Sequence, residues 1–134
     1  MSFELTIITP EGKEDKQAVD RLSLPTEDGI RTVLANHMEM VIPVAIGQIK
    51  LINPSSVTEY AVSEGLFHFK DNQAKLLVRT FESPKEIDQK RAQEAYERAK
   101  DRIEKKKQSK AEEIDLKRAE MALKRAIARL NVKG

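Results

Sequence analysis

The sequence predicts an N-terminal antiparallel β-sandwich over residues 1–83, followed by a C-terminal antiparallel αα-hairpin over residues 84–134. Two observations predict this division. All five prolines and four of the five glycines lie at or before position 84, and neither residue type occurs between Pro84 and Gly134. Five of the six aromatic residues also lie in the first part. Because turn residues separate strands, their absence over about fifty residues indicates long helices.

Runs rich in β-branched and aromatic residues, or alternating between apolar and polar residues, indicate strands in the first part. Turn residues separate them, and Asp71-Asn72 is expected to form a short turn of its own. Short strands at this spacing are typical of a sandwich or barrel, and roughly eight to ten strands fit the length. Segment 26–37 is the least regular and is expected to be a surface loop. The predicted strands are 3–9, 19–24, 47–52, 58–63, 66–70 and 74–80.

The second part begins with a strong helix-start signature, Ser83-Pro84-Lys85-Glu86. Serine can accept the N3 amide as a cap, proline has no amide to lose, and glutamate can reach back to the cap. The same signature recurs at residues 109–112, so the sequence predicts helices over 84–105 and 110–131. A connection this short makes the two helices antiparallel neighbours.

The predicted contact faces of the two helices are rich in alanine. Small residues let helix axes approach closely but bury little area, so the hairpin should be only marginally stable by itself. Its high helix propensity means that each helix could persist when the pair separates, which suits an element that moves. These faces are Ile87, Ala92, Ala95, Tyr96, Ala99 and Ile103 on the first helix, and Ile114, Ala119, Ala122, Leu123, Ala126 and Leu130 on the second.

The net charge of +2 is unevenly distributed. Residues 1–80 carry 8 Lys/Arg and 11 Asp/Glu, a net of −3, whereas residues 81–134 carry 16 and 11, a net of +5. The helical part is therefore the part expected to contact anionic partners. Its basic residues alternate with acidic ones and aromatic residues make up only 4% of the chain, so no nucleic-acid partner is expected. No apolar run reaches the roughly 20 residues that span a bilayer.

The hexapeptide Ile-Asp-x-Lys-Arg-Ala occurs twice, at residues 87–92 and 114–119. A structural interpretation is that each aspartate complements a helix start and pairs with the arginine three residues later. A functional interpretation is that Asp88 and Arg91 present an acceptor and a charged fork to a small anionic ligand. Similarly, Arg118, Arg125 and Arg129 form either a solvated row or a phosphate-binding face, and both interpretations remain open.

Catalytic and metal-binding residue patterns are lacking. His37 and His68 have no acidic or histidine partners at metal-ligand spacing, so we expect structural or surface roles for them and no metal. The absence of cysteine excludes thiol catalysis and cysteine-based metal sites. No phosphate-binding glycine loop, G-x-S-x-G motif or nucleophile with its base occurs. An enzymatic function therefore has no residues to support it.

Several segments, in order along essentially the whole chain, resemble bacterial ATP synthase epsilon subunits. Residues 87–92 match the I-D-x-x-R-A motif of that family, and residues 117–126 match its closing K-R-A-E-x-A-L-x-R-A. The chain departs from the family pattern over 27–37, where the family has G-E-x-G-x-L-P-G-H, and at Glu64, which replaces a glycine. The N-terminal matches are weaker. Residues 7–12 resemble the opening strand and V-T-P-x-G turn of the family, and Asn36-His37 resembles its G/N-H-x-P segment. Residues 63–67 resemble its S-G-G-F strand.

The resemblance implies a non-catalytic subunit in the central stalk of a proton-translocating rotary ATP synthase, peripheral on the cytoplasmic face of the bacterial cell membrane. The sandwich would bind the gamma subunit and the membrane rotor (c) ring. The hairpin would fold down on the sandwich or extend along gamma to the catalytic beta and alpha subunits, where it inhibits ATP hydrolysis. ATP, acting as a regulatory ligand without magnesium, would favour the folded form.

The same resemblance implies two sets of functional residues. The ATP-binding set is Glu82, Ile87, Asp88, Arg91, Ala92, Arg98, Arg125 and Arg129, and the inhibitory basic face is Lys117, Arg118, Lys124, Arg125 and Arg129. An alternative from composition alone is an adaptor or chaperone-like binding module outside ATP synthase. Co-purification with a large membrane ATPase and an ATP-sensitive protease resistance of the hairpin would distinguish the first hypothesis from the second.

Overall fold

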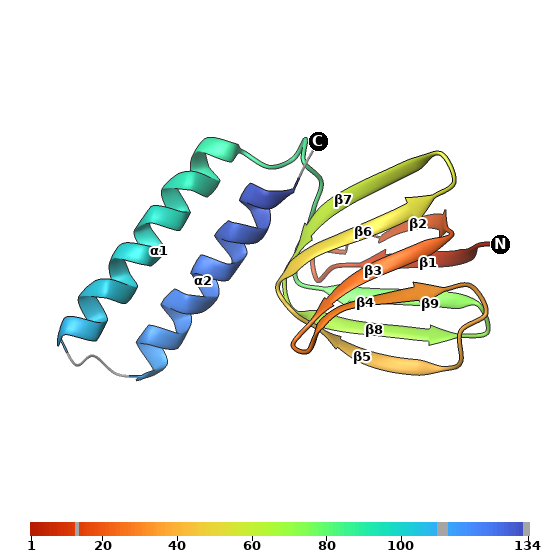
Figure 1. Cartoon of the computed structure of the whole chain (residues 1–134), viewed down its shortest axis with the longest axis horizontal. Coiled ribbons are helices and arrows are strands. Elements are labelled where there is room, and N and C mark those ends of the chain that lie inside the picture. Colours follow the sequence, from red (N-terminus) through yellow and green to blue (C-terminus); the bar gives the residue numbers. More distant parts are fainter. Residues whose placement is uncertain (13, 110–112, 133–134) are drawn as a thin grey trace.

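The computed structural model describes residues 1–12, 14–109 and 113–132, and the side chains of all of these except 106–109, 113 and 114. The described chain forms a sandwich of two sheets, with two antiparallel helices at one end of it (Figure 1). The strands are β1 Phe3–Ile8, β2 Glu14–Val19, β3 Arg21–Thr26, β4 Gly29–Leu34, β5 Met40–Val44, β6 Gly47–Asn53, β7 Ser56–Val62, β8 Gly65–Lys70, β9 Gln73–Val78 and β10 Phe81–Glu82. The helices are α1 Gln89–Ser109 and α2 Glu113–Asn131.

The two sheets have the strand orders β2-β1-β9-β8-β5 and β10-β7-β6-β3-β4. Neighbouring strands are antiparallel except β1 and β9, which are parallel. Alternate residues of each strand point inward, as in β9, where Ala74, Leu76 and Val78 are buried between exposed neighbours. The core contains fully buried Phe67 and Phe69 and extends no further along the chain than Phe81. The sandwich therefore has a core separate from the helices, which confirms the predicted fold class.

Segment 26–37 is not a surface loop, and this prediction was wrong. β4 occupies half of it and pairs with β3 from Arg21↔Leu34 to Thr26↔Gly29. β3 also continues through Pro25, where the prediction ended it. A proline fits there because β6 pairs with β3 only at residues 21–23, so the missing amide removes no bond to that strand.

Three further strands, β2, β5 and the two-residue β10, were missed. β2 is largely polar and buries only Val19, so its side chains carry no strand pattern. Its backbone nevertheless pairs with β1 from Phe3↔Val19 to Ile8↔Glu14. β2 is therefore a strand because its backbone forms hydrogen bonds with β1, and not because of its own side chains. The predicted turn at Asp71-Asn72 is confirmed, because both residues have positive φ, at 50° and 59°, between the paired Lys70 and Gln73.

The first helix begins at Gln89, five residues later than predicted. Ser83 and Glu86 form an isolated turn instead, in which the Glu86 amide donates to the Ser83 carbonyl at 3.0 Å and the Ser83 hydroxyl donates to the Glu86 side chain at 3.1 Å. Asp88 is the actual cap, since its Oδ1 accepts the Arg91 amide at 3.1 Å. Between turn and cap, Ile87 is buried. The second predicted start, at 109–112, lies largely outside the described residues.

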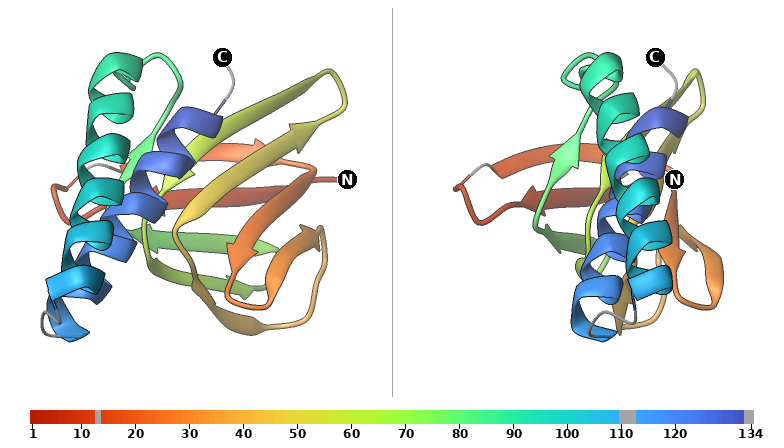
Figure 2. Two further views of the ribbon diagram at one scale, coloured as in Figure 1. Left: turned by 60° about the vertical axis from the view of Figure 1, so that its left-hand side comes forward. Right: turned by 90° about the vertical axis from the view of Figure 1, so that its left-hand side faces the viewer.

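The helices pack as an antiparallel pair, and α2 lies between α1 and the sandwich (Figures 1 and 2). α2 contacts β6 and β7 of the second sheet. The predicted alanine-rich seam is observed in part, with Ala92, Ala99, Ala119 and Ala126 all buried. The hairpin is thus folded down against the sandwich in this conformation.

Candidate functional site

The candidate site is the hairpin–sandwich interface, where the C-terminal half of α2 meets β7, β10 and the linker before α1. A small apolar cluster forms its centre. Ala61 of β7, Ile87 of the linker and Ala128 of α2 are each 8% exposed or less. Ala92 and Val132 complete the buried set. Because three of these five side chains are alanines, the cluster buries little apolar area and holds the hairpin only weakly.

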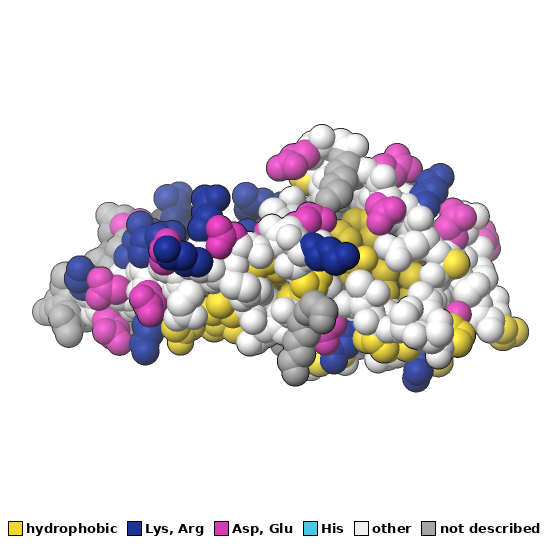
Figure 3. Space-filling view, turned by 90° about the horizontal axis from the view of Figure 1, so that it is seen from above, with side chains coloured by type: hydrophobic (Ala, Val, Ile, Leu, Met, Phe, Trp, Pro, Cys, Tyr) yellow, Lys and Arg dark blue, Asp and Glu magenta, His cyan; other side chains and the backbone are white. Residues whose placement is uncertain are grey.

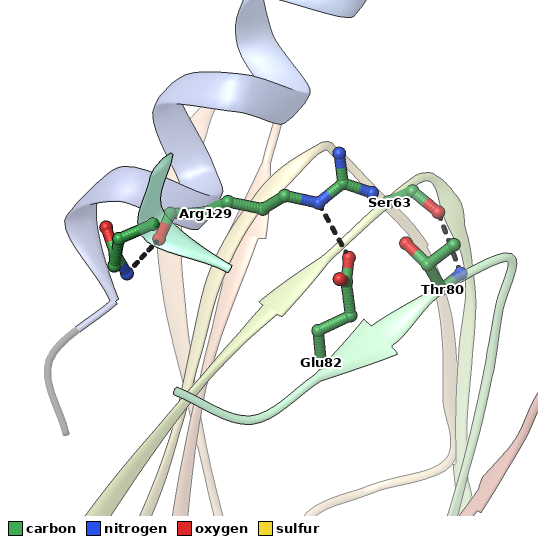
Figure 4. Close-up of polar contacts among 5 residues, drawn as sticks. Ser63, Thr80, Glu82 and Arg129 are labelled. Atoms are coloured by element: carbon green, nitrogen blue, oxygen red, sulfur yellow. Dashed lines mark hydrogen bonds and ion pairs between the residues drawn. The ribbon is translucent and has the colours of Figure 1, made fainter. Parts of the chain in front are cut away.

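One ion pair accompanies this cluster. Arg129 Nε of α2 donates to Glu82 Oε1 of β10 at 2.8 Å, with the two side chains 32% and 25% exposed. Figure 4 shows the arginine reaching across from the helix to the strand, with its terminal nitrogens projecting beyond the carboxylate. Gln89 Nε2 of α1 also approaches the Arg129 carbonyl oxygen, at 3.5 Å. The C-terminal turn of α2 is therefore in contact with both the sandwich and the start of α1.

Arg125, one helical turn before Arg129, faces the same strands. Together with Glu82 and Thr80, these two arginines border a space of about 10 Å³ at the interface. A space of this size holds no more than about one water molecule. A nucleotide bound among these groups would therefore have to displace the Arg125 or Arg129 side chain.

The structure brings together five of the eight residues in the predicted ATP-binding set. Glu82, Arg125 and Arg129 border the small space, and Ile87 and Ala92 lie in the adjacent apolar cluster. Asp88 and Arg91 are exposed at the start of α1, next to this group in sequence. Arg98 is also exposed and lies about 9 Å beyond Ala92 along the helix, at 1.5 Å per residue.

The chemistry of this set fits an anionic ligand that carries a hydrogen-bond donor. Arg91, Arg125 and Arg129 supply guanidinium groups from both helices, which bind phosphate through paired N–H donors. Asp88 already accepts the Arg91 amide through Oδ1, so capping uses one side of this carboxylate. For the motif at residues 87–92, the structure shows Asp88 at the helix start, in line with the structural interpretation. Binding of a ligand by Asp88 and Arg91 stays a prediction.

Four residues of the predicted inhibitory face lie on the side of α2 that faces the sandwich. Lys117 and Lys124 border a groove of about 750 Å³ between α2 and the turns of the sandwich, and Arg125 and Arg129 border the smaller space. Arg118 is exposed. Figure 3 shows Lys and Arg side chains over the helices, interspersed with Asp and Glu. The folded conformation therefore partly covers the basic face.

Glu64 is an interface residue that the sequence analysis noted only as a departure from a family pattern. Its Oε1 accepts a hydrogen bond from Arg79 Nη1 at 3.0 Å, and its side chain borders the groove beneath α2. Burial raises the pKa of Glu64, but its own backbone amide, Arg79 and the charge of Arg125 together outweigh burial and hold the pKa below its ordinary value. The available sequence signal was a carboxylate in place of glycine at a tight strand connection.

The outer face of the first sheet carries a row of exposed apolar side chains. Ile8, Leu77, Leu66 and Pro43 are cross-strand neighbours on β1, β9, β8 and β5. Leu66 is 49% exposed and Leu77 45%. A contiguous apolar row on an outer face is typical of a surface that binds another protein.

The histidines make local contacts. His68 Nε2 lies 3.5 Å from Glu39 Oε1, and His37 Nδ1 lies 2.8 Å from the Met38 carbonyl oxygen. Within the described ranges, no group of three or more His, Cys, Asp or Glu side chains is arranged to hold a metal ion. Neither described helix is long and apolar enough to cross a membrane.

Two protein-family descriptions match the chain. The ATP synthase delta/epsilon chain β-sandwich domain matches residues 2–84, and the long α-helix domain of the same chain matches residues 85–134. The ATP synthase epsilon chain of Caldicellulosiruptor bescii is 38% identical over 104 residues, which cover 78% of this chain and 76% of that protein. The ATP synthase epsilon chain of Halalkalibacterium halodurans is 38% identical over 107 residues, 80% of each chain.

Solved structures show the same fold at lower identity. A chain of the Euglena gracilis mitochondrial ATP synthase, in a structure of OSCP, F1 and the c-ring, superposes with a TM-score of 0.76 at 22% identity. The match covers 92% of this chain and 76% of that one. A chain of the central stalk and c-ring of the Tetrahymena thermophila mitochondrial ATP synthase superposes with a TM-score of 0.52 at 16% identity, covering 62% and 67%.

Proposed function

The chain belongs to the ATP synthase delta/epsilon chain family, and on this premise we propose that it is a central-stalk subunit whose hairpin regulates ATP hydrolysis. The epsilon chain is a non-catalytic subunit of ATP synthase. Family membership removes the alternative of an adaptor or chaperone-like module outside ATP synthase. In the proposed function, the sandwich couples the stalk to the membrane rotor, and the hairpin alternates between a folded and an extended position.

The observation that carries this proposal is the composition of the hairpin–sandwich interface. Among the described residues, the contact includes a small apolar cluster in which three of the five buried side chains are alanines, and the Arg129–Glu82 ion pair. No helical residue among those the structure describes belongs to the sandwich core, so the core keeps its own packing when the hairpin leaves. Release of the hairpin therefore requires only the free energy of the hairpin–sandwich interface. A ligand or a partner subunit that binds one position better can offset this free energy.

We propose that ATP stabilises the folded position by bridging the two helices. Arg91 of α1 and Arg125 and Arg129 of α2 would share its phosphates, and Asp88 would accept the adenine amino group. A ligand that contacts both helices and the linker binds the folded hairpin better than the separated helices. At ten times its Kd, such a ligand shifts the equilibrium by about 1.4 kcal/mol, or roughly tenfold.

Titration of ATP into the isolated protein, followed by amide NMR in the presence of a chelator, tests this binding. Asp88→Asn is the informative variant, because asparagine keeps the helix cap while it removes the carboxylate. We expect weaker ATP binding by Asp88→Asn and by Arg91→Ala, and unchanged binding by Arg118→Ala, which removes an exposed arginine outside the proposed set. A wild-type spectrum unmoved by millimolar ATP, or equal binding by all variants, contradicts the assignment.

The inhibitory role is assigned to the basic face of α2. Lys117, Arg118, Lys124, Arg125 and Arg129 would face acidic loops of the catalytic beta subunits once the hairpin extends. In the folded conformation Lys117 and Lys124 border the groove beneath α2 and Arg129 is paired with Glu82. Replacement of the five residues by alanine should raise ATP hydrolysis by the reconstituted enzyme. Unchanged hydrolysis, with the subunit still bound, counts against the role.

A disulfide between hairpin and sandwich tests the proposed movement directly. The chain has no cysteine, and Ala61 and Ala128 share the buried cluster, so Ala61→Cys with Ala128→Cys creates a single possible disulfide. The oxidised protein should lose its inhibition of ATP hydrolysis in the reconstituted enzyme, and reduction should restore inhibition. The two single-cysteine variants are the controls. Equal inhibition by the oxidised and reduced forms would show that inhibition needs no release of the hairpin.

We assign binding of the gamma subunit to the apolar row on the outer face of the first sheet. Leu66 and Leu77 are paired across β8 and β9 and are about half exposed, so their side chains contribute little to the core. Leu66→Asp with Leu77→Asp should abolish association with gamma, in a pull-down assay, while the variant keeps the amide NMR dispersion of the wild type. Retained association refutes this assignment and leaves the hairpin proposal intact.

A further inference from the structure

Glu64 is held rigidly at the connection between β7 and β8. The Arg79 amide donates to the Glu64 carbonyl oxygen at 3.3 Å, and Arg79 Nη1 donates to Glu64 Oε1 at 3.0 Å. The next residue is Gly65, where any Cβ would overlap the Leu77 carbonyl oxygen and the Val78 Cα. The backbone at this point is closely packed, and the bond from Arg79 orients the Glu64 carboxylate.

The second carboxylate oxygen of Glu64, Oε2, is buried and has no hydrogen-bond partner within the described part of the protein. The side chain borders the groove beneath α2, together with Lys117 and Lys124. A buried carboxylate oxygen without a donor is unfavourable unless a cation or water lies near it. The structure therefore provides an acceptor on the sandwich that faces the basic side of α2.

Arg125 lies on the same stretch of α2, next to the strand ends that flank Glu64. Arg125, Val62 and Thr80 border the same small space. Val62 lies two residues before Glu64, and Thr80 directly follows Arg79, which binds the Glu64 carboxylate. The Thr80 amide donates to Ser63 Oγ at 2.9 Å, so these two strands are tied together beside Glu64 (Figure 4). The charge of Arg125 also contributes to the lowered pKa of Glu64, in agreement with this placement.

We propose that Glu64 is a second acidic group that holds the hairpin on the sandwich, by attracting Arg125 across the interface in addition to the Glu82–Arg129 ion pair. Arg125 and Arg129 are four residues apart and lie on one face of α2, so the two carboxylates would act on successive turns of the helix. The glycine that the family pattern has at position 64 carries no carboxylate, so this contact distinguishes the chain from relatives with that pattern. The inference rests on the proposed release of the hairpin from the sandwich.

A single introduced thiol measures release of the hairpin in the isolated protein. Ala128 is 5% exposed and belongs to the interface cluster, so the thiol of Ala128→Cys should react only when α2 leaves the sandwich. Adding Glu64→Gln should speed thiol labelling by up to about fivefold, which corresponds to the upper end of the free energies of exposed ion pairs. Glu39→Gln, which removes a sandwich carboxylate that pairs with His68, should leave the labelling rate unchanged.

Two further measurements make the result specific. Ala126 is buried on the opposite side of α2, toward α1, so labelling of Ala126→Cys reports separation of the two helices and should not respond to Glu64→Gln. Arg125→Gln lies on the hairpin, so it leaves the sandwich unaltered and should speed labelling of Ala128→Cys by itself. Combined with Glu64→Gln it should add little, whereas Arg118→Gln combined with Glu64→Gln should behave additively.

Equal labelling with and without Glu64→Gln, or additive effects of Glu64→Gln and Arg125→Gln, would overturn the inference. The measurement uses neither ATP nor the assembled enzyme. Failure of ATP binding or of inhibition therefore leaves this result standing, and failure here leaves the proposed function standing.

Discussion

Neutralising Glu82 should release the hairpin without unfolding either part of the protein. Glu82→Gln keeps the size of the side chain and an oxygen that can accept Arg129 Nε–H, so the substitution removes the charge and little else. The Arg129–Glu82 distance of 2.8 Å and the exposures of 32% and 25% identify a partly buried, charge-assisted hydrogen bond. The apolar cluster of Ala61, Ile87 and Ala128 is untouched by the change.

The expected magnitude follows from this geometry. Glu82→Gln keeps a hydrogen bond to the still charged guanidinium of Arg129 but removes the attraction between two opposite charges, an expected loss of about 1 kcal/mol. Exposure of a quarter to a third of each side chain prevents a larger value, since exposed pairs contribute about 0.2–1 kcal/mol. A loss of about 1 kcal/mol corresponds to roughly a fivefold larger population with the hairpin released.

The assay is the labelling rate of the Ala128→Cys thiol, measured with Glu82→Gln, with Arg129→Gln and with both substitutions. We expect each single variant to speed labelling about fivefold and the double variant to match the singles, because the interaction is lost once. Circular dichroism should show unchanged helix content. An unchanged labelling rate, or strictly additive effects, would refute the reasoning that this ion pair holds the hairpin.

Three further predictions address the sandwich and the pH response. Gly65→Ala should cost about 3 kcal/mol or more in urea unfolding, because its Cβ meets the backbone of Leu77 and Val78, whereas Gly47→Ala meets only the Pro25 ring at 2.9 Å and should cost about 1 kcal/mol. Against the rise caused by burial, the backbone amide and Arg79 lower the pKa of Glu64 in both positions of the hairpin, whereas Arg125 lowers it only while the hairpin is docked. The contribution of Glu64 to docking should therefore be present at neutral pH and should be lost as pH falls through the lowered pKa. Spin labels at Ser55→Cys and Glu120→Cys should report this loss as a longer distance on acidification, and the same response in Glu64→Gln would assign it to other groups. A fragment of residues 1–83 should give a dispersed amide NMR spectrum, because the core cluster of the sandwich lies wholly within it, and a disordered spectrum would contradict this.

The sequence by itself determined the division into sandwich and hairpin, because that division depends on local backbone preferences. Glycine and proline interrupt regular structure wherever they occur, so their confinement to one part of the chain locates the strands and the helices. The turn at Asp71 and Asn72 also follows from a local backbone preference, because both residues tolerate the positive φ of a two-residue turn. The predicted alanine seam follows from helical periodicity, which a single segment also carries within itself.

Only the tertiary structure decided which of several local possibilities was used. β2 and β4 are strands because partners bind their backbones, although their own side chains show no clear strand pattern. Two caps competed for the start of α1, and burial of Ile87 in the interface accompanies the use of Asp88 rather than Ser83. Glu82 and Arg129 lie 47 residues apart and meet only because α2 folds back onto β10. Pairings of this kind depend on the path of the whole chain, so no local sequence preference specifies them.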